Sequence, residues 1–393
     1  MNMRAYMDHN ATAPVRSEVA AAVAHALTQT GNPSSVHGEG RKAHALVEEA
    51  RGEVAALVGA KAQEVIFTSG GTEAANLAIH NAIAALGVER IIISSIEHDC
   101  LRAPVAASGV PVDILPVDAN GVADLAHLPA LLEKSGKALL VLMLANNETG
   151  VLQPMADAAA LAKASGALVL CDAVQAAGKV PVDMKALGAD MLLLSAHKIG
   201  GPQGVGALVI REGLAFDPLI RGGGQEKRRR AGTENVAGIA GFGSAARLAH
   251  LALGEATNIA ALRDHLEKAL SIAQPQVEIF GASAARLPNT SLFAASGLDA
   301  EMLIMALDLD GFAVSAGSAC SSGKVARSHV LGAMGIADDL AGAAIRVSLG
   351  AGNTETEIDR LVESWSRIVK RMQDKARLAA AKADIPALAE VEH

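Results

Sequence analysis

Seven short apolar runs, separated by loops and helical segments, constrain the fold of this chain more than any other feature. They occupy residues 65–68, 91–95, 112–115, 139–144, 168–171, 191–194 and 207–210. Most are continuously apolar and do not alternate with polar residues, which is typical of strands buried on both faces of a parallel sheet. The pattern therefore predicts an α/β fold with a mostly parallel seven-stranded sheet covered by helices.

A different pattern begins after a helical stretch at about 234–270. It is a smaller α+β section, with strands predicted at 290–293, 312–315 and 345–348. The last helix is predicted to begin after Asn353 or Thr354, with acids in its first turn. Its apolar residues fall on one face at helical spacing, and they are Ile358, Leu361, Val362, Trp365, Ile368, Val369 and Met372.

Length and composition limit the classes of protein to consider. The 393 residues are sufficient for two domains, and we predict a large domain at 14–254 and a small α+β domain that combines 1–13 with 255–393. The net charge of -8 and the aromatic content of 2% argue against a general nucleic-acid binder. Residues 1–10 contain no apolar targeting segment and no run is long enough to span a bilayer, so a cytoplasmic protein without membrane contact is expected.

Polar residues follow several of the predicted strands at what would be one edge of the sheet. Ligands of open α/β sheets bind beyond the carboxyl ends of the strands. Ser69-Gly70-Gly71-Thr72 follows the first run and enters a helix, which makes a site suited to a phosphate. The residues that follow later runs include His98, Asn147, Asp172, Gln175 and Lys198.

Lys198 lies in a turn that follows the sixth apolar run and is closed by two glycines and a proline. A lysine desolvated at the end of a buried strand has a lowered pKa and can act as nucleophile and base. Singly, Lys198 could be a loop lysine, His98 a surface histidine and Asp172 a helix cap. Together with the phosphate site they are the set that pyridoxal phosphate requires: a Schiff-base lysine, a flat group over the ring and a carboxylate for the pyridinium nitrogen.

Other motifs for phosphate or metal do not match. Residues 317–324 have five residues between their glycines, and Val325 follows the lysine, so they do not form a P-loop. Glu97, His98 and Asp99 are adjacent and would point in different directions, so no metal site is predicted. The three cysteines, Cys100, Cys171 and Cys320, lack the spacing of a zinc site or a disulfide framework.

The chain resembles cysteine desulfurases of the fold-type I pyridoxal-phosphate superfamily, in the subclass that serves iron–sulfur cluster assembly and nitrogen fixation. The resemblance starts at residues 6–12 and covers nearly the whole chain. Nine further motifs follow in the order typical of that family, at 31–35, 67–73, 97–98, 146–150, 172–175, 195–198, 230–235, 317–323 and 345–350.

The resemblance implies a role for each matching residue. Lys198 would hold the cofactor covalently, Asp172 would pair with the pyridinium nitrogen, and Gln175 would bond the ring hydroxyl. His98 would stack on the ring. The implied phosphate ligands are Gly71, Thr72, Ser195, His197 and, from the partner subunit, Thr233. The implied contacts of the substrate carboxylate are Asn147, which also counts as a cofactor contact, Arg346 and Asn32. A residue from the partner implies a homodimer with shared active sites, and the basic run 227–230 would form a positive rim near the cofactor and the dimer contact.

Cys320 lies in a run of small residues, 315–323, that cannot pack a core. The resemblance implies that the segment at about 315–328 carries Cys320 as the catalytic thiol of the small domain. Its thiolate would take the sulfur of L-cysteine as a persulfide and leave alanine, with Lys198 moving the α-proton and His98 as a candidate base. An iron–sulfur scaffold or another acceptor protein would receive the sulfur, and Cys320 could transiently ligate a cluster. Cys171 is expected to be buried, and Cys100 is interpreted as structural.

Two other classes of function remain open on the sequence. A selenocysteine lyase or an aminotransferase could share this fold, although an aminotransferase needs no loop cysteine. A catalytically silent binding platform would be expected to lack Lys198, Asp172 or Cys320. The chain departs from the family pattern at Ala13 and Ala196 and in residues 324–327, which leaves the acceptor open more than the chemistry.

Overall fold

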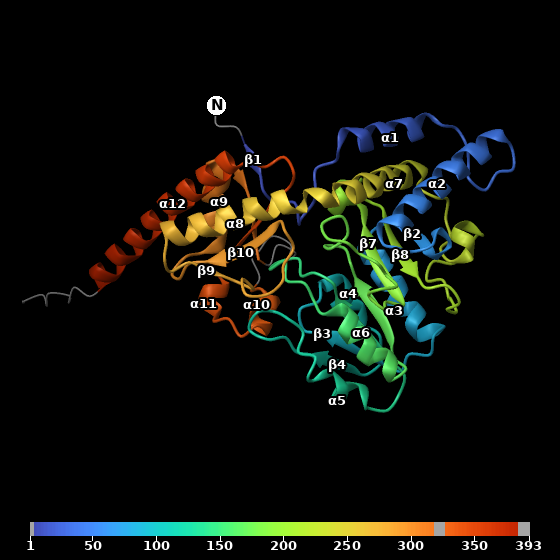
Figure 1. Cartoon of the computed structure of the whole chain (residues 1–393), viewed down its shortest axis with the longest axis horizontal. Helices are drawn as coiled ribbons and strands as arrows, with labels where there is room; N and C mark the ends of the chain where they lie inside the picture. Colours follow the sequence, from blue (N-terminus) through green and yellow to red (C-terminus); the bar gives the residue numbers. More distant parts are fainter. Residues whose placement is uncertain (1–3, 318–326, 384–393) are drawn as a thin grey trace, which may run out of the picture.

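The computed structural model describes residues 4–317 and 327–383, with side chains up to residue 374. Figure 1 shows two α/β units side by side, connected by the consecutive helices α7 (Val236–Leu251) and α8 (Ala256–Ala273). The large unit extends from α1 to α7, and the small unit comprises β1 and the elements from α8 onward. The exact domain boundaries given above stay a prediction.

A seven-stranded sheet forms the centre of the large unit, in the order β2-β8-β7-β6-β5-β3-β4. In this sheet β8 runs in the opposite direction to the other six strands, so the predicted α/β fold with a mostly parallel sheet is confirmed. All strands except the edge strand β4 are buried along their whole length, as their continuous apolar sequences require. The strands are β2 (Val65–Thr68), β3 (Arg90–Ser94), β4 (Val112–Leu115), β5 (Ala138–Met143), β6 (Leu168–Asp172), β7 (Met191–Ser195) and β8 (Gly206–Ile210).

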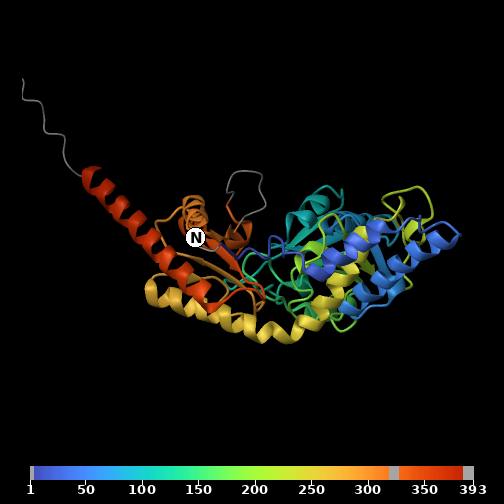
Figure 2. The same cartoon turned by 90° about the horizontal axis from the view of Figure 1, so that it is seen from above.

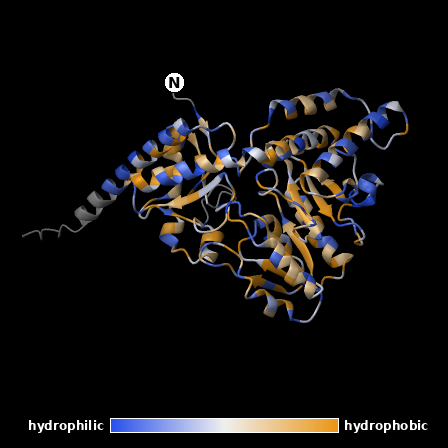
Figure 3. Cartoon of the chain, viewed as in Figure 1, coloured by the Kyte–Doolittle hydropathy of each residue, from blue (hydrophilic) through white to orange (hydrophobic). Residues whose placement is uncertain are grey.

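Helices cover both faces of this sheet. On β7, Leu192 and Leu194 join the core cluster of α2, α6 and α7, whereas Met191 and Leu193 join the cluster of α3 and α4 on the other face. Figure 3 shows the apolar strands enclosed between these layers. The helices are α1 (Ser17–Thr28), α2 (Gly38–Leu57), α3 (Gly71–Ala84), α4 (Asp99–Ala106), α5 (Leu128–Leu132) and α6 (Met155–Ala164).

The small unit contains two short sheets. One has the order β12-β13-β10-β9, and the other pairs β1 with β11, so that the N-terminal segment belongs to this unit. The strands are β1 (Ala5–Tyr6), β9 (Glu278–Ile279), β10 (Thr290–Ala294), β11 (Phe312–Ala313), β12 (Ser315–Ala316) and β13 (Ile345–Ser348). The single strand predicted at 312–315 is therefore wrong: residue 314 separates β11 from β12, because their partners lie in different sheets. The helices besides α8 are α9 (Ala300–Leu309), α10 (His329–Ala333), α11 (Asp338–Ala341) and α12 (Glu355–Ala383).

The last helix, α12, begins where the sequence predicts. The backbone N–H of Thr354 donates to the Glu357 carboxylate at 3.0 Å, and the N–H of Glu357 donates to the Thr354 hydroxyl at 3.3 Å, which forms a capping box. The predicted apolar face is buried from Ile358 to Val369, and Met372 packs against its edge. Figure 2 shows the far end of α12 projecting away from both units.

One helical stretch of the described chain, Val236–Ala273, is long and apolar enough to cross a membrane. It consists of two helices joined by a short 3-10 segment, and α7 has eight buried residues packed in the core of the large unit. Burial of this kind is typical of a core helix.

Candidate active site

A cavity of about 370 Å³ lies beyond the carboxyl ends of the central strands, where the large unit meets the small one. Among the predicted site residues that the structure describes, all except Asn32 and Thr233 line it. Its lining consists of Asn10, Ala11, Gly71, Thr72, His98, Cys100, Met143, Ala145, Asn147, Asp172, Val174, Gln175, Ser195, His197, Lys198 and Arg346. The topology thus brings together side chains that are far apart in the sequence.

The predicted phosphate loop lies between β2 and α3, with Gly71 as the first residue of the helix. A side chain at Gly206 on β8 would put its Cβ 2.7 Å from the carbonyl carbon of Gly70, so only glycine lets this loop lie so close to the sheet. Gly71 and Thr72, in the first turn of α3, line the cavity, and the N–H groups of a first helical turn have no partner within the helix, which suits them to an anion. Gly206 is a supporting residue that the sequence analysis missed.

Glu73 supports the phosphate loop from behind. Its carboxylate accepts from the backbone N–H of Ser69 at 2.8 Å and from Nε of Arg230 at 2.9 Å. Arg230 is the last residue of the basic run, so part of this run does lie near the predicted cofactor. The contact of the run with a partner subunit stays a prediction.

Two further predicted phosphate ligands, Ser195 and His197, follow the end of β7. Nδ1 of His197 lies 3.3 Å from the hydroxyl of Thr12. Burial and the charge of Lys198 lower the pKa of His197 to about 4, so its imidazole is neutral at physiological pH. A neutral ring can donate one hydrogen bond to a phosphate without a proton being lost or gained.

Asp172 is the last residue of β6, lines the cavity and is only 6% exposed. Its Oδ1 accepts from the backbone N–H of Val174 at 2.9 Å. Burial raises the pKa of this carboxyl, opposed by the Val174 hydrogen bond and by the charges of His98 and Lys198. A cationic N–H placed against Asp172 would restore its ionised form.

His98 is the N-cap residue of α4, and its Nδ1 accepts from the backbone N–H of Cys100 at 3.1 Å. The neutral ring must therefore carry its proton on Nε2, and this contact fixes the ring at the cavity wall. Cys100 lines the cavity too, whereas Cys171 is fully buried on β6 as predicted.

Lys198 lies in a 3-10 turn after β7 that ends at Gly200, whose φ of 80° favours glycine. Its amine donates to the backbone oxygen of Asn10 at 2.6 Å and to that of Ala11 at 2.9 Å. The N-terminal segment therefore holds the lysine at the boundary between the two units. Asn10 has no role predicted from the sequence, although it lies in the first matching motif.

Arg346, on strand β13 of the small unit, also lines the cavity. It is 3% exposed, and it donates to the carbonyl oxygen of Asn147 at 2.9 Å and to the Asp8 carboxylate at 2.8 Å. Its Nε has no hydrogen-bond partner among the described residues. A guanidinium held in this way is suited to a carboxylate, because it can still offer a donor.

Glu148 is a second residue that the sequence analysis missed. The hydroxyl of Ser328 donates to its Oε2 at 2.5 Å, and a Cβ at Gly317 would lie 3.2 Å from the same oxygen. Glu148 thus contacts the residues on both sides of the Cys320 segment. Cys320 itself lies outside the described residues. Burial raises the pKa of Glu148 to about 7, although Ser328 and Arg346 favour its charged form.

Two predicted residues lie away from the cavity. Asn32 is exposed in the turn between α1 and α2, where its side chain accepts from the backbone N–H of Ser34 at 2.9 Å. Its predicted role as a substrate contact is therefore not supported within its own chain, because this local turn holds it at the surface. Thr233 lines a different cavity of about 200 Å³, next to Ser69.

The residues present fit pyridoxal phosphate. The cavity is lined by the first turn of α3, which suits an anion, and by the buried Asp172, by His98 and by Lys198. The desolvated Asp172 suits a pyridinium nitrogen, and the neutral His197 suits a phosphate oxygen.

Comparison with known proteins agrees with this geometry. Residues 5–361 match the aminotransferase class-V family. Cysteine desulfurase 2 of Trichormus variabilis is 44% identical over 373 residues, which cover 94% of each chain. Cysteine desulfurase of Cereibacter sphaeroides is 45% identical over 94% of this chain and 97% of its own. Cysteine desulfurase IscS of Dictyoglomus turgidum is 40% identical over 95% of this chain and 96% of its own.

Solved structures show the same relationship. A NifS-like protein from Rickettsia africae superposes with a TM-score of 0.86 at 37% identity, over 93% of this chain and 99% of that one. The predicted dependence on pyridoxal phosphate is confirmed by these relatives. The chain belongs to the aminotransferase class-V family, among its cysteine desulfurases.

Proposed function

We propose that this chain removes sulfur from L-cysteine, releases L-alanine and carries the sulfur as a persulfide on Cys320. The observation that carries this proposal is the meeting of Lys198, Asp172 and Arg346 in one cavity. The amine, the acid and the guanidinium come from three different elements and two units, and they match the needs of an amino-acid substrate bound to pyridoxal phosphate.

Each residue has a defined task in this reaction. The bound cofactor supplies an electron sink for the substrate carbon atoms. Arg346 and Asn147 orient the carboxylate of L-cysteine, and Lys198 holds the cofactor and then moves the α-proton. Asp172 keeps the ring nitrogen protonated.

The sulfur transfer balances without an external oxidant. The thiolate of Cys320 attacks the substrate sulfur, the carbon–sulfur bond breaks, and a sulfur–sulfur bond forms. The electron pair of the broken bond stays with the carbon, which takes up a proton and leaves as alanine. Cys320 finishes as a persulfide.

The proposal extends to the assembly and the acceptor. Thr233 lines a cavity next to Ser69 rather than the site of its own chain, which supports a homodimer in which Thr233 reaches the phosphate of the partner subunit. An iron–sulfur scaffold or another sulfur acceptor in the cytoplasm is the proposed partner, and the similarity to an IscS protein supports it.

The test is alanine formation from L-cysteine in the presence of a thiol reductant. Wild type is expected to turn over, and Cys320→Ser is expected to lose turnover while it keeps the cofactor absorbance. In a separate sample without the reductant, the wild-type peptide that contains Cys320 should gain the mass of one sulfur atom. Equal alanine formation by both proteins would contradict the role of Cys320. A preference for L-selenocysteine that survives in Cys320→Ser would favour a selenocysteine lyase.

A further inference from the structure

A second lysine, Lys179, contacts Gln175 of the cavity lining and has no task in the reaction described above. It follows Gly178, whose φ is 74° and where a Cβ would lie 2.8 Å from the side chain of Ala249. This turn brings the lysine amine under Gln175. The amine donates to Gln175 Oε1 at 2.7 Å and to Asn10 Oδ1 at 3.0 Å.

These contacts determine which way the Gln175 side chain faces. The Lys179 amine donates to two oxygens, Asn10 Oδ1 and Gln175 Oε1, and it has the N–H groups for both contacts in its charged and in its neutral form, so it pairs with the oxygen of the Gln175 amide. The amide NH₂ is then left to donate, and Nε2 contacts the backbone oxygen of Asn10 at 2.9 Å. Lys179 and the backbone oxygen of Asn10 thus favour the same orientation of the amide, and removing Lys179 removes one of these two contacts. Lys179 therefore selects a donor at the point where Gln175 lines the cavity.

The same network reaches the catalytic lysine. The backbone oxygen of Asn10 accepts from Lys198 at 2.6 Å and from Gln175, while the Asn10 side-chain oxygen accepts from Lys179 and from Asn289 at 3.1 Å. Asn10 is only 1% exposed. Lys179 and Lys198 therefore donate hydrogen bonds to the same buried residue, Asn10.

Lys179 also faces a second cavity, of about 560 Å³, between the two units. Lys198 lines this cavity too, and its other charged or titratable residues are Tyr6, His9, Arg16, Glu255 and Glu357. Burial and the charges of Lys198 and Arg346 lower the pKa of Lys179 well below its usual value. Its hydrogen bonds to two oxygens can persist in the neutral form, because a neutral amine still has two N–H groups.

We propose that Lys179 is a positioning residue for the reaction: it orients Gln175 as a donor to the ring oxygen of the bound cofactor and holds Asn10 under Lys198. This inference rests on the proposed function. A donor at the ring oxygen favours the state in which that oxygen is most negative, so it lowers the pH at which the bound cofactor loses its proton. Lys179 thereby lowers the pH at which the bound cofactor loses its proton, although it does not contact the cofactor itself.

The test is a pH titration of the cofactor absorbance in the holoenzyme. Lys179→Met keeps the length of the side chain and removes its donors. We expect the midpoint to rise by about one pH unit, a tenfold change in proton affinity. Gln175→Met should raise it similarly, and the double variant should rise no further than Gln175→Met alone. Lys179→Arg, which retains the donors, should restore the midpoint.

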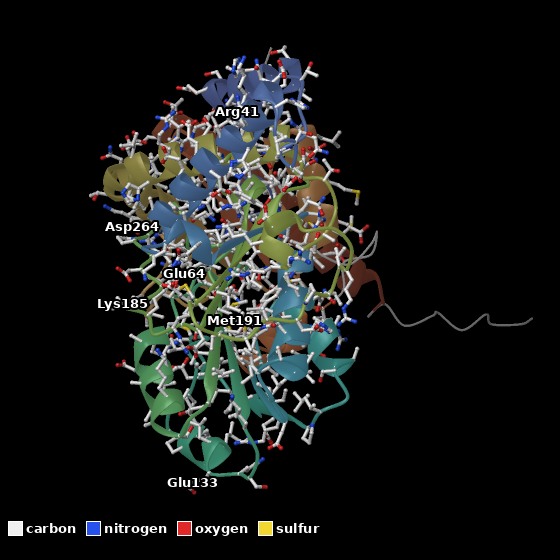
Figure 4. The ribbon with its side chains drawn as sticks, turned by 90° about the vertical axis from the view of Figure 1, so that its right-hand side faces the viewer. Arg41, Glu64, Glu133, Lys185, Met191 and Asp264 are labelled. Carbon is white, nitrogen blue, oxygen red and sulfur yellow. The ribbon has the colours of Figure 1, made fainter. Side chains whose placement is uncertain are left out.

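Lys185→Met is the matched control, because Lys185 is exposed at the edge of the large unit (Figure 4). It should leave the midpoint unchanged. An unchanged midpoint in Lys179→Met would overturn the proposal, and so would a shift that persists in full when Gln175 is already Met. If Lys179→Met does not retain the cofactor, the midpoint of Lys179→Arg decides: a wild-type value supports the proposal, and a raised value overturns it. The titration does not require the substrate L-cysteine. A failure of alanine formation in wild type would therefore count against the proposed function alone.

Discussion

Replacing Glu148 by glutamine tests the electrostatics beside the Cys320 segment. The residue is 3% exposed, and its only described side-chain hydrogen bond is the one from Ser328 at 2.5 Å. Glutamine has nearly the same shape and can accept the same hydrogen bond through its oxygen. The substitution therefore removes the ionisation of the side chain and little else.

The magnitude follows from the pKa of Glu148, which burial raises from 4.5 to about 7. This difference corresponds to about 3 kcal/mol of folding free energy. Between pH 4.5 and 7 the folded protein binds more protons than the unfolded chain, so this group reduces stability as the pH rises. The ionisation of buried Glu148 therefore costs no stability below pH 4.5, and it costs the full amount above pH 7. Glutamine has no such cost at any pH.

The assay is guanidinium denaturation of wild type and Glu148→Gln from pH 5 to 8.5, at equal protein concentration and cofactor occupancy. The variant should match wild type near pH 5 and become more stable by about 3 kcal/mol at pH 8. Glu133→Gln is the control, because Glu133 is exposed at the rim of the large unit (Figure 4). A stability difference that does not change with pH, or a variant less stable at pH 8, would refute the reasoning.

Two further substitutions test the substrate end of the cavity and the support of the basic run. Arg346→Lys should lower kcat/KM for L-cysteine about a hundredfold, because lysine cannot contact Asn147, Asp8 and a carboxylate together. Steady-state kinetics would show this loss while the cofactor spectrum stays unchanged. An unaltered kcat/KM would contradict the prediction. Glu226→Gln should destabilise the protein by about 3 kcal/mol, because it leaves the buried Arg51 without the carboxylate that accepts its two N–H groups at 2.7 and 2.9 Å. Guanidinium denaturation at pH 7 measures this loss, and a change below about 0.5 kcal/mol would show that the pair is not needed.

The sequence by itself determined the seven strands of the large unit and most of the candidate site. Continuous apolar runs are a local property, and their starts and ends agree with the strands to within a residue or so, as at β2 and β4. Lys198, Asp172 and His98 could be proposed because each directly follows such a run, and parallel strands bring their carboxyl ends to one edge. The resemblance supplied the roles that spacing alone could not.

Only the tertiary structure decided which distant groups meet and how they titrate. The antiparallel direction of β8 and the division of residues 312–316 into two strands depend on partners far along the chain. The contact of Asp8 with Arg346 joins residues 338 positions apart, and no local pattern encodes it. The raised pKa of Glu148 comes from burial by both units. Hydrophobic periodicity is a property of residues that are close together in the sequence. Desolvation and long-range contacts arise only when the chain has packed.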